Sequence, residues 1–199
     1  MSEGVLLGPL VLFAAAMCFT PGPNVIMVTA SAANFGFRRT VPQMIGLTFS
    51  FGAMIVAVGL GLAGLLEAEP RVHAALRYAG AAYLIYLAWC IARAQPRGDA
   101  AKRAKPIGLI EAALLQWVNP KGWVSALGAL STYTSAGGNV VWETAIIAAV
   151  LATFCFASVA LWGGFGTVIG RYLKNPRVRT AFNWSMAGLL VASLIPVFW

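Results

Sequence analysis

The sequence has few charged residues for its length. Of its 199 residues, 10% are charged and 60% are hydrophobic, whereas a soluble domain carries about 25% charged residues. The chain therefore lacks the polar side chains needed to cover a globule in water. This excludes a disordered chain, a nucleic-acid-binding module and an ordinary soluble enzyme. A small integral membrane protein is the class that remains.

Reactive and metal-binding side chains are also scarce. Cys18, Cys90 and Cys155 lie far apart within apolar runs, no CxxC pair occurs, and His73 is the only histidine. This pattern favours small packing residues over a redox pair or a metal site. The sequence also lacks the GxxxxGK[ST] motif that binds nucleotide phosphates. We therefore expect no cofactor, no metal ion and no enzymatic activity.

Long apolar segments, by contrast, are abundant. A membrane-spanning helix needs about 20 apolar residues, so the chain has room for about six spans with short connections. Apolar segments are found at about residues 5–35, 41–66, 72–91, 107–133, 140–169 and 178–198. Unpaired backbone groups are too costly in hydrocarbon, so each segment is expected to be helical. The sequence thus predicts an all-α integral membrane protein with six transmembrane helices.

Most of the 14 basic residues gather in three of the connections between these segments. Cytoplasmic loops carry the excess of Lys and Arg, so these connections are predicted to face the cytoplasm. Both termini then face the periplasm of a bacterial inner membrane. The apolar runs between the clusters argue against a nucleic-acid partner. The clusters are Arg38 and Arg39; Arg93, Arg97, Lys102, Arg103 and Lys105; and Arg171, Lys174, Arg177 and Arg179.

Two of the six segments are interrupted by proline near their centres. Pro21 lies in the string TPGPN of the first segment, and Pro120 lies 99 residues further on, in NPKG of the fourth. Adding 99 to the residue numbers of the second segment gives the fifth segment. Adding 99 to those of the third gives a range that overlaps the sixth. Three spans per half would place the second half upside down. We expect one transmembrane transporter domain over residues 1–199, with inverted repeats at about 1–95 and 106–199 and a cytoplasmic linker at 96–105.

The two interruptions form the candidate substrate-binding site. Thr20 and Asn119 are expected to cap half-helices that begin at the prolines following them. The backbone N–H groups in the first turn of each half-helix would then be free. Together with the ammonium of Lys121, they would suit a carboxylate near the middle of the membrane. The alternative is that both prolines are ordinary helix kinks. The candidate residues are Thr20, Pro21, Gly22, Pro23, Asn24, Asn119, Pro120, Lys121 and Gly122.

Two other features leave alternatives open. Glu111 lies about five residues inside the fourth segment. It is either a carboxylate solvated at the cytoplasmic interface or a proton carrier coupled to transport. The glycine pairs Gly4/Gly8 and Gly166/Gly170 mark either a homodimer interface or close helix packing within one chain.

At its two breaks the sequence resembles the lysine exporter superfamily of bacterial amino-acid efflux proteins. The strings TPGPN, at 20–24, and NPK, at 119–121, are typical of that family. The stretches 80–89 and 127–132 look most like its cysteine/O-acetylserine exporter branch. At 131–134 the chain reads STYT, and so departs from the Pro-Gln-Phe-like segment of many homoserine- and threonine-type members.

The resemblance implies secondary active export of amino acids or close derivatives from the cytoplasm, driven by the proton gradient or the membrane potential. The implied partners are a small amino-acid substrate and the lipid bilayer. The alternatives are a non-transporting structural membrane protein and a membrane thiol–disulfide carrier. The carrier needs two cysteines that meet across the repeat, whereas the residue 99 positions after Cys18 is Trp117.

Overall fold

A computed structural model of the chain describes residues 7–62, 70–93, 106–135, 138–173 and 175–193. Every regular element within these ranges is a helix, as the composition predicts. All six predicted apolar segments are helical where they are described, and the first and fourth are each divided into two helices. The predicted linker at 96–105 lies outside the described residues.

The helix boundaries follow local backbone signals. The first segment forms two helices bent by 53° relative to each other. Gly36 then turns the chain directly into the next helix with a φ of 85°, a conformation that favours glycine. The elements are α1 (Leu7–Phe19), α2 (Pro23–Phe35), α3 (Phe37–Ala57) with the π-helix η1 (Val58–Leu62), α5 (Pro70–Ala92), α6 (Leu109–Trp117), α7 (Pro120–Tyr133), α8 (Val140–Tyr172) and α9 (Pro176–Ala192).

Within the described residues, two helices and one bent pair are long and apolar enough to cross a membrane. They are Phe37–Gly61, Val140–Tyr172 and the bent pair α1–α2 taken as one broken span. The 33 residues of α8 make a helix about 50 Å long. This exceeds the roughly 30 Å of hydrocarbon in a bilayer, so α8 must tilt or extend beyond it. The structure thus shows a helical bundle suited to a membrane, while the six spans and the inverted repeat remain predictions.

Large apolar side chains cover the outside of this bundle as well as its core. Phe49 exposes 78% of its surface, and Leu12 and Ile110 each expose 73%. The interior is also apolar, with Leu47 and Leu151 completely buried. A monomeric soluble protein rarely leaves so much contiguous apolar surface in water. The apolar exterior of the bundle is therefore suited to the hydrocarbon interior of a membrane.

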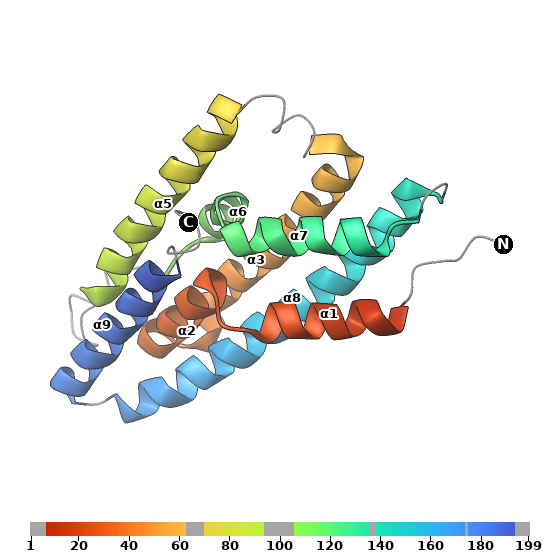
Figure 1. Ribbon diagram of the computed structural model, residues 1–199. Coiled ribbons are helices and arrows are strands. Elements are labelled where there is room, and N and C mark those ends of the chain that lie inside the picture. Colours follow the sequence, from red (N-terminus) through yellow and green to blue (C-terminus); the bar gives the residue numbers. More distant parts are fainter. Residues whose placement is uncertain (1–6, 63–69, 94–105, 136–137, 174, 194–199) are drawn as a thin grey trace.

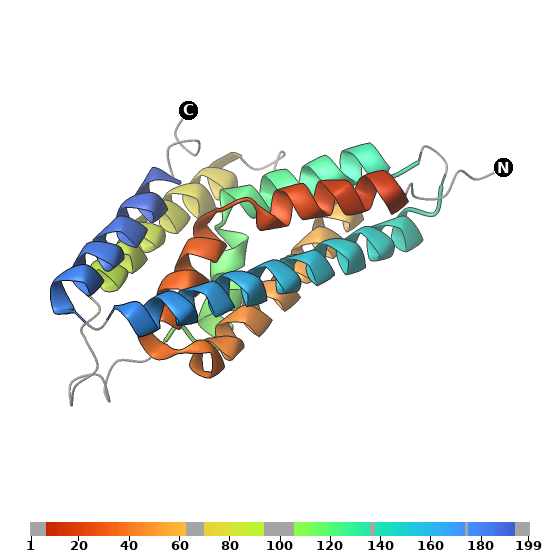
Figure 2. The same ribbon diagram turned by 90° about the horizontal axis from the view of Figure 1, so that it is seen from below.

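Each broken segment packs against the long helix of the other half of the chain. α1 and α2 lie along α8, and α6 lies along α3. α5 and α9 pair with each other at one flank of the bundle (Figures 1 and 2). The two halves are thus interleaved, and the breaks come together in the middle of the molecule.

Two glycines allow α8 to approach α2 closely. A Cβ at Gly166 would collide with the carbonyl of Thr29, and one at Gly170 would collide with that of Ala33. Of the two interpretations of this glycine pair, the structure supports packing within one chain. Nothing lies within 4 Å of a Cβ built at Gly8, and Gly4 lies outside the described residues.

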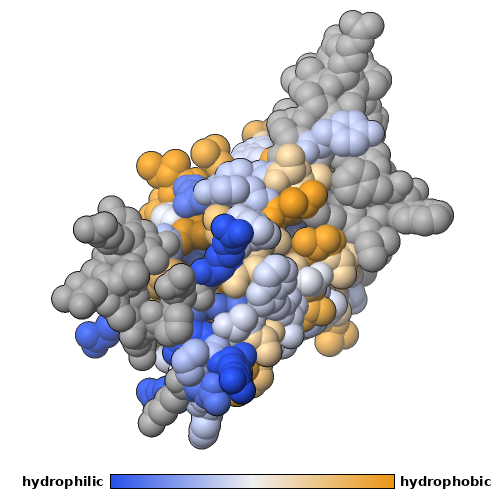
Figure 3. All heavy atoms as spheres, turned by 90° about the vertical axis from the view of Figure 1, so that its left-hand side faces the viewer, coloured by the Kyte–Doolittle hydropathy of each residue, from blue (hydrophilic) through white to orange (hydrophobic). Residues whose placement is uncertain are grey.

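The exposed basic residues whose side chains the structure describes gather at one end of the bundle. The C-terminal ends of α2, α5 and α8 meet the N-terminal ends of α3 and α9 on the left of Figure 1, and Figure 2 agrees. Viewed from this side, the surface carries patches of hydrophilic side chains (Figure 3). All three predicted basic clusters contribute to this end. Their exposed members are Arg38, Arg39, Arg93, Arg171 and Arg177.

Candidate functional site

The first break is a non-helical stretch, residues 20–22, between α1 and α2. The Thr20 hydroxyl donates to the carbonyl oxygen of Ala16 at 2.5 Å, which closes the last turn of α1. Gly22 is extended and caps α2, whose first residue is Pro23. The prediction that Thr20 caps a helix beginning at Pro21 is therefore wrong. Pro23 starts the helix instead, since the first turn does not need its missing N–H.

The second break has the predicted cap. The side-chain oxygen of Asn119 accepts from the N–H of Lys121 at 3.2 Å, and Pro120 is the first residue of α7. The N–H of Gly122 donates to the main-chain oxygen of Asn119 at 3.0 Å. These two N–H groups were expected to be free, but the cap and the tight first turn occupy both. The positive charge at this break therefore comes from the side chain of Lys121.

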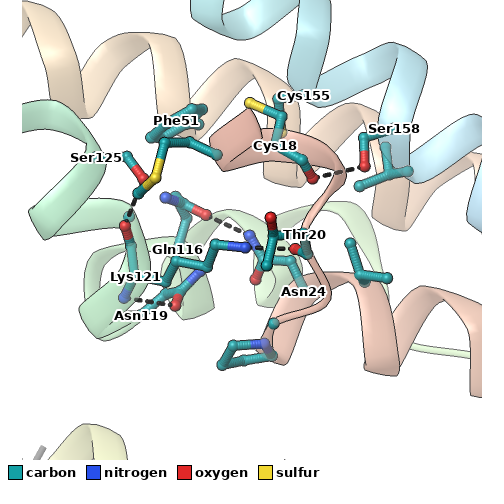
Figure 4. Close-up of a pocket in the computed structure, with 16 residues that line it drawn as sticks. Cys18, Thr20, Asn24, Phe51, Gln116, Asn119, Lys121, Ser125, Cys155 and Ser158 are labelled. Carbon is teal, nitrogen blue, oxygen red and sulfur yellow. Dashed lines mark hydrogen bonds between the residues drawn. The ribbon is translucent and has the colours of Figure 1, made fainter. Parts of the chain in front are cut away.

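Lys121 reaches from the second break to the first. Its ammonium donates a hydrogen bond to the main-chain carbonyl oxygen of Thr20 (Figure 4). Its aliphatic stem lies against Gly22, where a Cβ would be only 2.7 Å from Lys121 Cδ. Among the described residues, no carboxylate forms an ion pair with this ammonium. Lys121 is thus a half-buried cation whose partner is a neutral carbonyl.

A second contact also links the breaks. Asn24 Nδ2 donates to Gln116 Oε1 at 2.6 Å, while Asn24 Oδ1 is buried without a hydrogen-bond partner. Gln116 is itself buried, and its amide nitrogen makes only a long contact of 3.9 Å with the sulfur of Met54. A Cβ at Gly122 would collide with this amide. The two breaks therefore fit against each other, with one glycine on each side.

A cavity of about 50 Å³ lies between the breaks (Figure 4). In this conformation it has room for only a few water molecules. The structure brings most of the predicted site residues to its wall, and their role in binding stays a prediction. Pro21 and Pro120 do not line it. The predicted residues that do are Thr20, Gly22, Pro23, Asn24, Asn119, Lys121 and Gly122.

Other helices complete the wall with residues that sequence reasoning missed. Ser158 on α8 donates to the main-chain oxygen of Cys18 at 2.7 Å, and Ser125 on α7 donates to that of Lys121 at 2.7 Å. Gln116 and Phe51 also line the cavity. Gln116, Ser125 and Ser158 are all buried. Their only signal in the sequence is a polar side chain inside an apolar segment.

Two cysteines from different helices share this cavity. Cys18, at the end of α1, donates to the carbonyl of Leu151 at 3.7 Å, and Cys155 lies one helical turn further along α8. Both line the cavity. The repeat offset of 99 residues does not pair these two cysteines. They come to one cavity because α1, in the first half, packs against α8, in the second half.

Glu111 lies apart from the cavity, in the first turn of α6. One carboxylate oxygen accepts from the hydroxyl of Tyr83 at 2.5 Å, and the other accepts from the N–H of Gly108 at 3.4 Å. Five residues, or about 7.5 Å of helix, separate it from Gln116. The carboxylate thus caps α6 and joins it to α5. Both interpretations of Glu111 are compatible with these contacts.

An apolar helical bundle that holds a cavity with polar side chains in its wall, between two broken helices, has the architecture of a membrane transporter. The chain belongs to the family of LysE type translocators, whose family model matches residues 15–198. It is therefore a transporter and not an enzyme. The family match confirms the resemblance to the lysine exporter superfamily.

The chain is similar to proteins named cysteine/O-acetylserine efflux protein. It is 32% identical over 186 residues to the one from Escherichia coli strain K12. It is also 32% identical over 184 residues to the one from Salmonella typhimurium strain LT2. Each match covers 90% of this chain and 91% of the relative. No solved structure matches the chain.

Proposed function

We propose that the chain exports amino acids or close derivatives from the cytoplasm across a bacterial inner membrane. Relatives that match along most of its length are named as efflux proteins for cysteine and O-acetylserine. The observation that carries the proposal is the ammonium of Lys121, which lines the cavity and contacts a neutral carbonyl. A cation inside a membrane is costly and marks a functional site. A substrate carboxylate would balance its charge.

The substrate carboxylate binds at Lys121. In the structure the ammonium donates to the carbonyl of Thr20. A carboxylate is a stronger acceptor for an ammonium than a neutral carbonyl is, because the bond is charge-assisted at both ends. An amino acid entering the cavity therefore draws the ammonium away from Thr20. The first turns of α2 and α7, from Gly22 to Asn24 and from Asn119 to Gly122, form the walls around it.

Export follows from movement of the two inverted halves, residues 1–95 and 106–199, around this site. The reciprocal packing of each broken segment on the long helix of the other half supports this arrangement. Rocking one half against the other opens the cavity first to the basic, cytoplasmic end and then to the opposite side. Both chain termini face the periplasm in this scheme. Whether two copies associate stays a prediction.

The energy comes from the proton gradient or the membrane potential, and Glu111 is the candidate proton carrier. Its carboxylate lies on α6, the helix that leads directly into the second break. A change in its bond to Tyr83 would release α6 from α5. Protonation there is thereby coupled to movement of the half-helix that ends beside the cavity.

Replacing Lys121 with methionine tests the proposed site. Methionine retains an apolar stem and removes the charge. Loss of a charged hydrogen bond is worth about 1.5–3 kcal/mol, so substrate affinity should fall about 10- to 100-fold. The measurement is counterflow of labelled cysteine into vesicles reconstituted with purified protein. Arg177→Met, which removes an exposed cation at the end of the bundle, is the matched control and should transport normally.

Export assays in cells complete this test. Cells with the wild-type protein should accumulate less of at least one member of a panel of amino acids and toxic analogues than cells without it. Normal counterflow by Lys121→Met, with wild-type amounts of protein in the membrane, would contradict the role of the ammonium. Equal accumulation of every compound with and without the protein would contradict amino-acid export.

A further inference from the structure

We infer that the first break binds the α-ammonium group of the substrate, between the main-chain carbonyl oxygen of Thr20 and the side-chain oxygen Oδ1 of Asn24. Lys121 binds the carboxylate at the same time. The inference rests on the proposed function, since it assumes that an amino acid enters this cavity. It assigns the substrate class as α-amino acids that carry both charges, as opposed to simple carboxylic acids or simple amines.

The carbonyl of Thr20 already binds an ammonium group. Its donor in the structure is the side chain of Lys121. Thr20 directly follows the C-terminal end of α1, where the helix dipole places a partial negative charge. The neighbouring carbonyls are occupied from α8, that of Cys18 by Ser158 at 2.7 Å and that of Phe19 by Trp162 at 3.4 Å. The Thr20 carbonyl is therefore the one whose donor the substrate can replace.

Asn24 supplies the second acceptor. Its amide nitrogen is held by Gln116 at 2.6 Å, which fixes the orientation of the side chain. Its oxygen Oδ1 is buried and has no hydrogen-bond partner in the described part of the chain. A buried acceptor without a donor is costly, and such atoms in native proteins call for an explanation. An ammonium has three donors, so one group can bond to both Oδ1 and the Thr20 carbonyl.

Binding then exchanges one ammonium for another. The substrate carboxylate draws Lys121 away from Thr20, and the substrate ammonium takes the vacated carbonyl together with Asn24. The end of α1 keeps a cation throughout, and the zwitterion adds no net charge to the cavity. A carboxylic acid without an amine would leave both acceptors unpaired. An amine without a carboxylate would face the ammonium of Lys121 with nothing to neutralise it.

Three compounds that share one thiol side chain test this arrangement in reconstituted vesicles. Cysteine carries both charged groups, 3-mercaptopropionate lacks the ammonium, and cysteamine lacks the carboxylate. Each is added as a competitor of labelled cysteine counterflow. For the wild-type protein we expect cysteine to compete at least tenfold better than either analogue.

Asn24→Leu removes the acceptor oxygen at nearly constant side-chain size. It should weaken competition by cysteine about 10- to 100-fold and leave competition by 3-mercaptopropionate within twofold of the wild-type value. Asn24→Asp retains an acceptor oxygen and should keep cysteine at wild-type affinity or tighter. Lys121→Met should weaken both carboxylate-containing compounds. Size-exclusion profiles in detergent verify that each variant is folded.

The outcomes separate this inference from the proposed function. Equal binding of cysteine and 3-mercaptopropionate by the wild-type protein would overturn the ammonium site and leave export standing. So would an Asn24→Leu variant that weakens both compounds by the same factor, or an Asn24→Asp variant no better than Asn24→Leu. Absence of wild-type counterflow with every amino acid tested would overturn the proposed function, and the inference with it.

Discussion

At the scale of single residues, Gly22 decides how close the two breaks can come. The stem of Lys121 lies on its backbone, and no other residue type leaves that space open. A Cβ at Gly122 would likewise collide with the side-chain amide of Gln116. The two glycines therefore set the position of the ammonium and of the amide that orients Asn24.

Gly22→Ala should impair export without unfolding the protein. The new methyl group would stand 2.7 Å from Lys121 Cδ, so the flexible lysine side chain must move and its ammonium leaves the position proposed for binding the substrate carboxylate. We expect the rate of cysteine counterflow to fall about tenfold, equivalent to roughly 1.4 kcal/mol. Gly8→Ala is the control, because a Cβ there has nothing within 4 Å. Equal rates for Gly22→Ala and Gly8→Ala would show that the position of Lys121 is unimportant.

The sequence predicts the site residues that belong to its two local motifs. Thr20, Asn24, Asn119 and Lys121 are polar residues beside helix-breaking prolines, and local chemistry is enough to single them out. Ser158 could not be assigned in this way. It lies in the middle of an unbroken apolar helix, and its place at the cavity depends on how α8 is rotated against α1. Hydropathy does not determine such rotations.

At the scale of the helices, two glycines allow α2 and α8 to pack closely together. Gly166 and Gly170 lie one turn apart on α8 and meet the carbonyls of Thr29 and Ala33. Small residues with this spacing let two helix backbones pack directly together in a membrane. α2 is thus held against α8 up to the non-helical residues 20–22 of the first break.

Gly166→Ala should destabilise the protein, while Gly164→Ala should not. At Gly166 the methyl group meets the rigid carbonyl of Thr29, and such overpacking costs about 1–3 kcal/mol. At Gly164 nothing lies within 4 Å, and alanine stabilises a helix by about 0.5–1 kcal/mol relative to glycine. Thermal unfolding midpoints of the purified variants in detergent should therefore shift in opposite directions. A lower thermal unfolding midpoint for Gly164→Ala, with no decrease for Gly166→Ala, would contradict this account.

The positions of the helices were largely predictable, but the details of their ends were not. Apolar runs predict α3 and α8 because such runs have no other stable form in a membrane. The start of α2 was misplaced by two residues, since both Pro21 and Pro23 satisfy the rule for a first helical position. The choice depends on the Thr20 hydroxyl, which bonds back to Ala16. That contact forms only once α1 exists.

At the scale of the whole molecule, α6 connects the site to the basic end of the bundle. Glu111 and Tyr83 join α6 to α5 at that end, and Gln116 meets Asn24 at the other. A nine-residue helix is short enough to move as one rigid piece. On the proposed mechanism, a change at the carboxylate is transmitted to the cavity through α6.

Glu111→Gln tests whether this connection couples export to protons. The amide cannot take up or release a proton, so export by this variant should lose its dependence on an imposed pH gradient, while downhill counterflow continues. Tyr83→Phe retains the carboxylate but removes the hydrogen bond that joins α6 to α5, so on this mechanism it should lose the dependence as well. Vesicles with a defined pH difference provide the measurement. A Glu111→Gln variant that responds to the gradient like the wild type would exclude Glu111 as the carrier.

The bond between Lys121 and Thr20 has a consequence for the cell. On the proposed mechanism, Lys121 competes with the ammonium group of the substrate for the carbonyl of Thr20. The apparent affinity for a substrate is reduced in proportion to the fraction of molecules in which Lys121 is bound to this carbonyl. On the proposed mechanism, a low cytoplasmic concentration leaves the carrier closed by its own side chain. Only a high cytoplasmic concentration of substrate displaces the lysine side chain. Export is then confined to substrate in excess of what the cell normally holds.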